Sequence, residues 1–173
     1  MELLEAIKGR RSVRAFKPQD VPGEIVEQLV DAARHAPSAG NLQPWEFIIV
    51  RKPEQKQRLA EAARQAFIEE APVVIVVCAD ENRAATGYGN RGKTLYCIQD
   101  TAAATQNILL TAYSLGLGTC WVGAFNEDEA RRALNLPSGI RPVAMIPVGY
   151  WAAKMPTPRS RRPLSQIMHF ESF

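Results

Sequence analysis

The sequence predicts one domain that is built from both helices and strands. Uninterrupted apolar stretches rich in β-branched residues predict buried strands, and segments with apolar residues at helical spacing alternate with them. The 173 residues suffice to bury roughly 70% of the surface of the unfolded chain, so the fold needs no metal or disulfide. The composition, with 46% hydrophobic and 23% charged residues, is that of an ordinary globular protein.

The first half of the chain predicts three helices and two strands. The second helix starts after Asp20 and Pro22 and stops before Pro37. Pro53 lies in the first turn of the third helix. N–H groups in a first turn have no intrahelical acceptor, so a proline, which lacks the N–H, costs no hydrogen bond there. The stretch PVVIVVCA predicts a fully buried central strand. The elements in order are helices over 3–9 and 20–36, a loop over 37–44, a strand over 45–50, a helix over 52–66 and a strand over 72–79.

The second half continues the alternation and ends in a proline-rich arm. A polar segment over 80–93 predicts a surface loop, and the Ala- and Thr-rich helix after it is apolar on most sides, which indicates a buried central helix. Asn126 and Glu129 form a capping-box pattern. Pro142 and Pro147 place the last strand at a sheet edge or a bulge. The elements in order are a helix over 94–116, a strand over 119–125, a helix over 126–135, a strand over 141–151 and the arm.

The stretch GYGNRGKT, residues 87–94, matches the phosphate-loop pattern G-x-x-x-x-G-K-[ST]. A working phosphate loop leaves its strand directly, whereas residues 80–86 separate the end of the predicted strand from Gly87. A nucleoside triphosphate site also needs an acidic residue at the end of a second strand to hold Mg²⁺, and the two later strands carry none. The sequence therefore predicts a chance match within a surface loop.

Composition narrows the class of protein further. The net charge of +3 is too small to indicate nucleic acid or a membrane as a partner. Three widely spaced cysteines without a C-x-x-C pair, together with two histidines, predict neither a disulfide framework nor a metal centre. The N-terminal segment lacks the apolar core of a signal peptide, and the longest apolar stretch is too short to cross a bilayer. We therefore expect a cytoplasmic protein.

Five segments concentrate residues that suit a flat, anionic ligand. Arginine suits a phosphate because its planar guanidinium donates two hydrogen bonds at once, and arginine-rich stretches stand at both ends of the chain. A glycine at position 123 would let the backbone lie close against a flat ring. Each feature alone has an ordinary alternative, a solvated basic face or a β-bulge. The segments are RRSVRAF (10–16), PSAGNLQPW (37–45), GLGTCWVGAF (116–125), PVGYW (147–151) and RSRRPL (159–164).

In this order and spacing, over nearly the whole chain, the five segments resemble the nitroreductase family of FMN-dependent oxidoreductases. The resemblance implies an α+β fold with a mixed, mostly antiparallel sheet wrapped by helices. It also implies a homodimer with two flavins at the interface and exchanged C-terminal arms. Residues 1–150 would form the flavin-binding domain, and residues 151–173 an arm of that domain that carries phosphate-binding arginines. The implied reaction transfers two electrons from NADH or NADPH through FMN to a nitroaromatic, quinone or similar small-molecule acceptor.

The resemblance assigns cofactor contacts residue by residue. Arg10 and Ser12 match the phosphate and ribityl contacts, with Arg11 a less specific neighbour. Arg14 matches the cation at the pyrimidine edge of the ring, where a fixed charge stabilises reduced flavin. The other matches are Arg159 and Arg161 for phosphate, Gly123 and Ala124 for ring atoms N5 and O4, Gln65 for the pyrimidine edge, and Pro37, Ser38, Ala39 and Asn41 for a loop from the second subunit. No nucleophile or acid–base residue is predicted, because the flavin carries the hydride, and Asp100 is expected to be structural.

Three alternatives remain at this point. Relatives with the same fold dehalogenate aromatic substrates or consume their own reduced flavin, but these usually carry added lid segments and this chain is short. A flavin carrier without catalytic activity would bind FMN and would not be bleached by NADH or NADPH. A nucleotide hydrolase would be colourless and would bind ATP.

Overall fold

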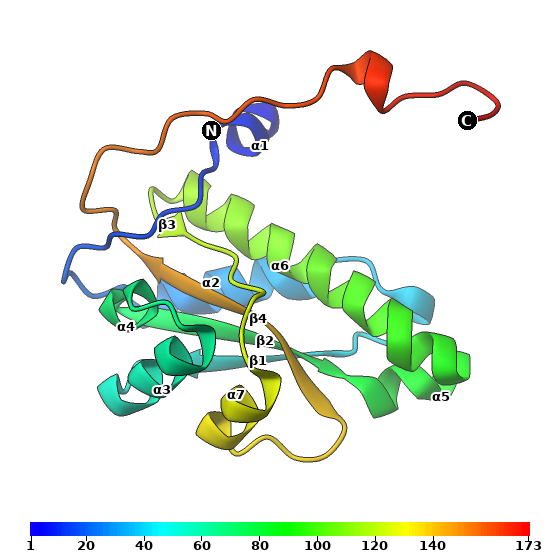
Figure 1. Ribbon diagram of the computed structural model, residues 1–173, viewed down its shortest axis with the longest axis horizontal. Helices are drawn as coiled ribbons and strands as arrows, with labels where there is room; N and C mark the ends of the chain where they lie inside the picture. Colours follow the sequence, from blue (N-terminus) through cyan, green and yellow to red (C-terminus); the bar gives the residue numbers. More distant parts are fainter.

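A four-stranded antiparallel sheet forms the centre of the computed structural model, which describes residues 1–173 (Figure 1). The strands stand in the order β1-β2-β4-β3. Their bounds are Trp45–Val50 for β1, Val73–Asp80 for β2, Gly118–Thr119 for β3 and Ile140–Gly149 for β4. At the β3 edge, Ser12 forms a parallel bridge with Thr119. The arrangement is therefore mixed but mostly antiparallel, as the family resemblance implies.

Helices cover both faces of the sheet. In β2, the alternate residues Val73, Ile75 and Val77 pack with α2 and α6, and the residues between them pack with α3 and α7 on the other face. This two-sided burial explains why β2 is apolar along almost its whole length. The helices are α1 Leu3–Gly9, α2 Gly23–Arg34, α3 Pro53–Ala63, α4 Phe67–Glu70, α5 Glu81–Arg91, α6 Cys97–Ser114 and α7 Glu127–Leu134. No helix combines the length and apolarity that a bilayer crossing requires.

The prediction of a strand over 119–125 is largely wrong, since only Gly118–Thr119 forms a regular ladder with β4. Further along, Val122 and Met145 exchange two backbone hydrogen bonds, at 3.0 and 2.9 Å. In that register the next such pair would join Cys120 to Pro147, which has no N–H to donate. The ladder is interrupted there, and residues 120–125 form an irregular segment along the sheet edge.

The last strand, β4, is central, so its predicted place at a sheet edge is wrong, whereas the predicted bulge is confirmed. Val77 pairs with Ala144 and Cys78 pairs with Pro142, which leaves Val143 as the extra residue. The proline thus sits where the ladder is already irregular, and its missing N–H disturbs little.

The polar segment 80–93 is helical, which corrects the predicted surface loop. Asp80 caps α5 by accepting a hydrogen bond from the Arg83 N–H at 2.9 Å. A π-helical turn, η2 (Gly92–Tyr96), then leads into α6, and a side chain at Gly92 would collide with the Ala84 carbonyl oxygen. The glycines of the phosphate-loop look-alike therefore serve helix packing, and Lys93 lies 3.7 Å from Glu81 rather than over an open loop.

The C-terminal arm leaves the body of the domain. Its start is held by the N-terminal segment, because Phe16 bridges to Trp151 and the Ala152 N–H donates to the Ala15 carbonyl at 3.0 Å. Beyond Pro156 every residue is exposed, and the only regular element is a short 3₁₀ turn, η3 (Leu164–Gln166). Figure 1 shows this segment, coloured orange to red, running outside the helices and the sheet.

Candidate flavin site

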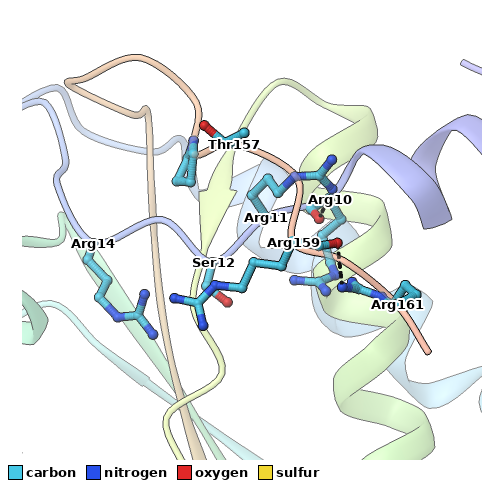
Figure 2. A pocket seen from close by; sticks show the side chains of 8 residues that line it. Arg10, Arg11, Ser12, Arg14, Thr157, Arg159 and Arg161 are labelled. Atoms are coloured by element: carbon cyan, nitrogen blue, oxygen red, sulfur yellow. Dashed lines mark hydrogen bonds between the residues drawn. The ribbon is translucent and has the colours of Figure 1, made fainter.

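Arginines from the two ends of the chain line one cavity of about 240 Å³. Figure 2 shows the N-terminal residues facing those of the arm, with the guanidinium groups of Arg14 and Arg159 pointing toward the space beside Ser12. Six of the predicted site residues meet here, which is the largest group that the fold brings together. The lining residues are Arg10, Arg11, Ser12, Arg14, Pro156, Thr157, Arg159 and Arg161.

Extended backbone explains why these particular side chains converge. The N-terminal segment runs along β3, where the Val13 N–H donates to the Thr119 carbonyl at 2.8 Å. Successive residues of an extended chain point to opposite sides, so Ser12 and Arg14 share one side while Val13 is buried on the other. The arm repeats the pattern, and its alternate residues 157, 159 and 161 all line the cavity.

The cavity carries positive charge without an acidic partner. None of its lining residues is Asp or Glu, and none of its arginines takes part in an ion pair. Arg161 donates only to the backbone carbonyls of Arg159 and Ser160, at 3.1 and 3.2 Å. Guanidinium groups gathered in this way repel one another, so the cluster is suited to an anion with several acceptor oxygens.

Two arginines near the cluster have local roles. Arg11 donates to the carbonyl oxygens of Lys8 and Arg10, at 2.6 and 2.8 Å, and so caps the end of α1 while it lines the cavity. Arg162 points elsewhere and donates to the Gln166 carbonyl at 2.8 Å. The role of Arg11 toward a ligand stays a prediction.

A buried thiol lies beside the cavity. Burial raises the pKa of Cys120, and Arg14, the Ser12 hydroxyl and Arg10 oppose that shift in part. A raised pKa keeps the thiol protonated and unreactive at neutral pH. Cys120 is thus packing under the arginine segment rather than a nucleophile.

The residues predicted to meet the ring do not line the cavity. Gly123 and Ala124 are exposed on the irregular segment that follows β3. Gln65 is half-buried between α3 and α4, near Phe67, whose ring holds the Arg14 guanidinium at 5.8 Å.

The predicted loop of Pro37, Ser38, Ala39 and Asn41 lies far from the cavity in the same chain. The Ala39 N–H donates to Asp100 in the first turn of α6, whereas Gly9, beside the cavity, packs on Tyr113 near the other end of that helix. An 18-residue helix is about 27 Å long. The structure does not bring this loop to the arginines of its own chain.

Pro156 and Thr157 line the cavity but were not among the site residues predicted from the sequence. Thr157 offers a hydroxyl on the same side of the arm as Arg159. The signal that could have revealed it is the two-residue spacing in PTPRSR, because an extended, proline-rich segment turns every second residue to one side.

The chain belongs to the nitroreductase family, whose model matches residues 7–70 and 61–150. One relative is a protein of Methanothermobacter thermautotrophicus that is named for NADH dehydrogenase and NAD(P)H nitroreductase. It is 40% identical to this chain over 156 residues, and the match covers 87% of this chain and 78% of the relative. An FMN reductase [NAD(P)H] of Bacillus subtilis is 29% identical over 99% of this chain and 74% of its own length. A solved nitroreductase family protein of Clostridium difficile matches with a TM-score of 0.89, at 34% identity over 100% of both chains. The predicted family and its α+β fold are confirmed.

Proposed function

We propose that the chain binds FMN in the arginine cavity and transfers two electrons from NADH or NADPH to a small acceptor such as a nitroaromatic or a quinone. As a member of its family the chain is an NAD(P)H-dependent oxidoreductase. FMN is proposed because the family resemblance implies it and because the cavity suits a phosphate. The observation that carries it is the arginine cluster without a carboxylate, which suits the dianionic phosphate of a mononucleotide.

Different cavity residues would bind different parts of the cofactor. Arg10, Arg159 and Arg161 would bind the phosphate oxygens, and the hydroxyls of Ser12 and Thr157 would donate to the phosphate or the ribityl chain. Bound FMN would supply the hydride chemistry that no side chain of the protein provides. The phosphate contacts fix the position of the ring, because they anchor one end of the cofactor at the boundary between arm and domain.

The surface beside the cavity would bind the ring. Arg14, steadied by Phe67, would place a fixed positive charge next to the ring and stabilise negative charge gained on reduction. The exposed backbone at Gly123 and Ala124 would offer N–H groups to its polar edge, with Gln65 at the pyrimidine edge. The face of the ring away from this surface would admit donor and acceptor in turn.

The site would be completed by a second subunit. The loop with Ser38 and Asn41 lies too far from the arginines of its own chain to contact a flavin bound there. Its predicted ring contacts therefore require a homodimer in which the loop of each subunit contacts the flavin of the other. Residues 151–173 would reach across the same interface, which couples dimerisation to flavin binding by mass action.

Replacing Gly123 by valine is expected to lower FMN affinity or shift the reduction potential without unfolding the protein. A Cβ at this position would meet only the Trp121 side chain, at 3.7 Å, so the apoprotein has room for it. A bulky side chain would instead lift the ring from the backbone N–H groups. Flavin titration, redox titration and a melting curve measure the three quantities. Unchanged affinity and potential in this variant would place the ring elsewhere.

Colour and anaerobic reduction test the proposal as a whole. The purified protein is expected to be yellow, and NADH or NADPH should bleach it when oxygen is excluded, with colour returning on addition of a quinone or a nitroaromatic. A yellow protein that neither nucleotide bleaches would be a flavin carrier. A colourless protein that takes up no added FMN would refute the assignment of the cavity.

A further inference from the structure

Asp100 is a buried carboxylate that the proposed reaction does not use. It is 7% exposed, and its two oxygens lie 3.2 and 3.3 Å from the Ala39 nitrogen. No arginine, lysine or histidine forms an ion pair with it. Burial raises the pKa of Asp100, and the hydrogen bond from Ala39 opposes that shift. Keeping a carboxylate buried without a cation is costly, which points to a role for its contact with Ala39.

That contact anchors a loop whose backbone is strained. Gly40, Asn41 and Gln43 have φ angles of 58°, 56° and 53°, in the left-handed region that residues other than glycine avoid. Within the loop, the Gln43 N–H donates to Ser38 Oγ at 3.0 Å, but this bond is exposed to solvent. Such a conformation persists only where its surroundings hold it, and Asp100 is a buried side chain that hydrogen-bonds to this loop.

We propose that Asp100 is a positioning residue for the flavin ring. Through the Ala39 N–H it holds residues 37–43 of one subunit in the conformation that contacts the flavin in the cavity of the other. The inference rests on the proposed function, since it needs a flavin and a dimer. Without the anchor, Asn41 and Gln43 relax out of the left-handed region and the loop loses its fit to the ring. Asp100 itself does not touch the flavin.

Titration of the dimeric apoprotein with FMN and with riboflavin tests this role. Riboflavin has the ring but no phosphate, so a defect in the loop weakens both ligands by the same factor. Asp100→Ala is expected to raise both dissociation constants roughly tenfold, the effect of one lost charge-assisted hydrogen bond. Asp100→Asn keeps one acceptor oxygen and should fall between the wild type and Asp100→Ala. Arg161→Ala, by contrast, should weaken FMN and leave riboflavin unchanged.

Thr105→Ala is the matched control for loss of a buried polar group in α6. Thr105 is fully buried and donates to the Thr101 carbonyl at 2.8 Å, away from the loop. Thr105→Ala should lower the melting temperature and leave the dissociation constants of FMN and riboflavin unchanged. Asp100→Ala should raise both dissociation constants. Equal riboflavin affinity in Asp100→Ala and the wild type overturns the inference but leaves the proposed function standing. A wild-type protein that binds neither flavin overturns both.

A second variant keeps the test decisive if Asp100→Ala does not fold. Arg83, on the exposed side of α5, donates to the Leu42 carbonyl and holds the same loop from outside. Arg83→Ala cannot disturb the core, and it is expected to weaken riboflavin and FMN in the same direction by a smaller factor. Unchanged riboflavin affinity in both Arg83→Ala and Asp100→Asn overturns the inference.

Discussion

Replacing Arg10 or Arg161 by alanine is expected to weaken FMN binding roughly ten- to a hundredfold. Each guanidinium lines the cavity without a carboxylate partner, so the ligand phosphate would be its anionic acceptor. A hydrogen bond to a charged group is worth about 1.5–3 kcal/mol, and about 1.4 kcal/mol corresponds to a tenfold change in affinity. Fluorescence titration of the apoprotein with FMN measures the loss, which should shrink at high salt.

Two control variants separate a contact from a general loss of charge. Arg162→Ala removes the same charge one residue further along the arm, from a side chain that donates to Gln166 outside the cavity. Lys93→Ala removes the lysine of the phosphate-loop look-alike, which lies beside Glu81. Both should bind FMN as the wild type does. If Lys93→Ala loses flavin while Arg10→Ala keeps it, the arginine cavity is not the phosphate site.

Much of the fold follows from local sequence, and the exceptions have physical causes. β1, β2 and α6 were predicted because their apolar patterns match the burial they meet. α5 was missed because its glycines and polar residues have low helix propensity, and the helix is held instead by the Asp80 cap and by packing around Ala84 and Gly92. β3 was predicted too long, because the effect of Pro147 on its neighbour depends on a register that only the folded sheet defines.

The site could be predicted only in pieces. The arginines lie at opposite ends of the chain, and no local pattern requires them to meet, so their convergence was expected from their suitability for phosphate and from the family resemblance. The backbone explains it: the N-terminal segment runs along β3, and the arm crosses it after the bridge between Phe16 and Trp151. The contact of Asp100 with Ala39 had no signal, because the two residues belong to different elements and no pattern in the sequence pairs them.

Deleting residues 164–173 is expected to give a smaller species on sizing and a lower FMN affinity together. Five large apolar side chains in this segment are at least half exposed in the single chain, from 50% for Met168 to complete exposure for Phe173. Burying each would contribute about 1.5–3 kcal/mol, so the arm has a strong tendency to dock. The five are Leu164, Ile167, Met168, Phe170 and Phe173.

A second subunit is the expected docking partner. Helix α1 exposes a further apolar surface at Leu3, Leu4 and Ile7, which one chain also leaves uncovered. The arm lines the cavity of its own chain as far as Arg161. An extended chain advances roughly 3.3 Å per residue, so residues 162–173 can still reach tens of ångströms beyond it. Dimerisation would cover both surfaces at once, and it would carry the 37–43 loop to the cavity of the other chain.

The truncation leaves Arg159 and Arg161 in place, so a loss of FMN affinity would come from the lost partner loop and not from the phosphate site. Phe170→Ser should reproduce part of the effect, because it removes one of the apolar side chains that we expect to dock at the interface. Ser165→Ala, an exposed change in the same arm, should leave size and affinity as they are. A truncated protein that elutes with the intact protein and binds FMN equally well would show that the arm contributes nothing to the dimer, and that the loop reaches the flavin without it.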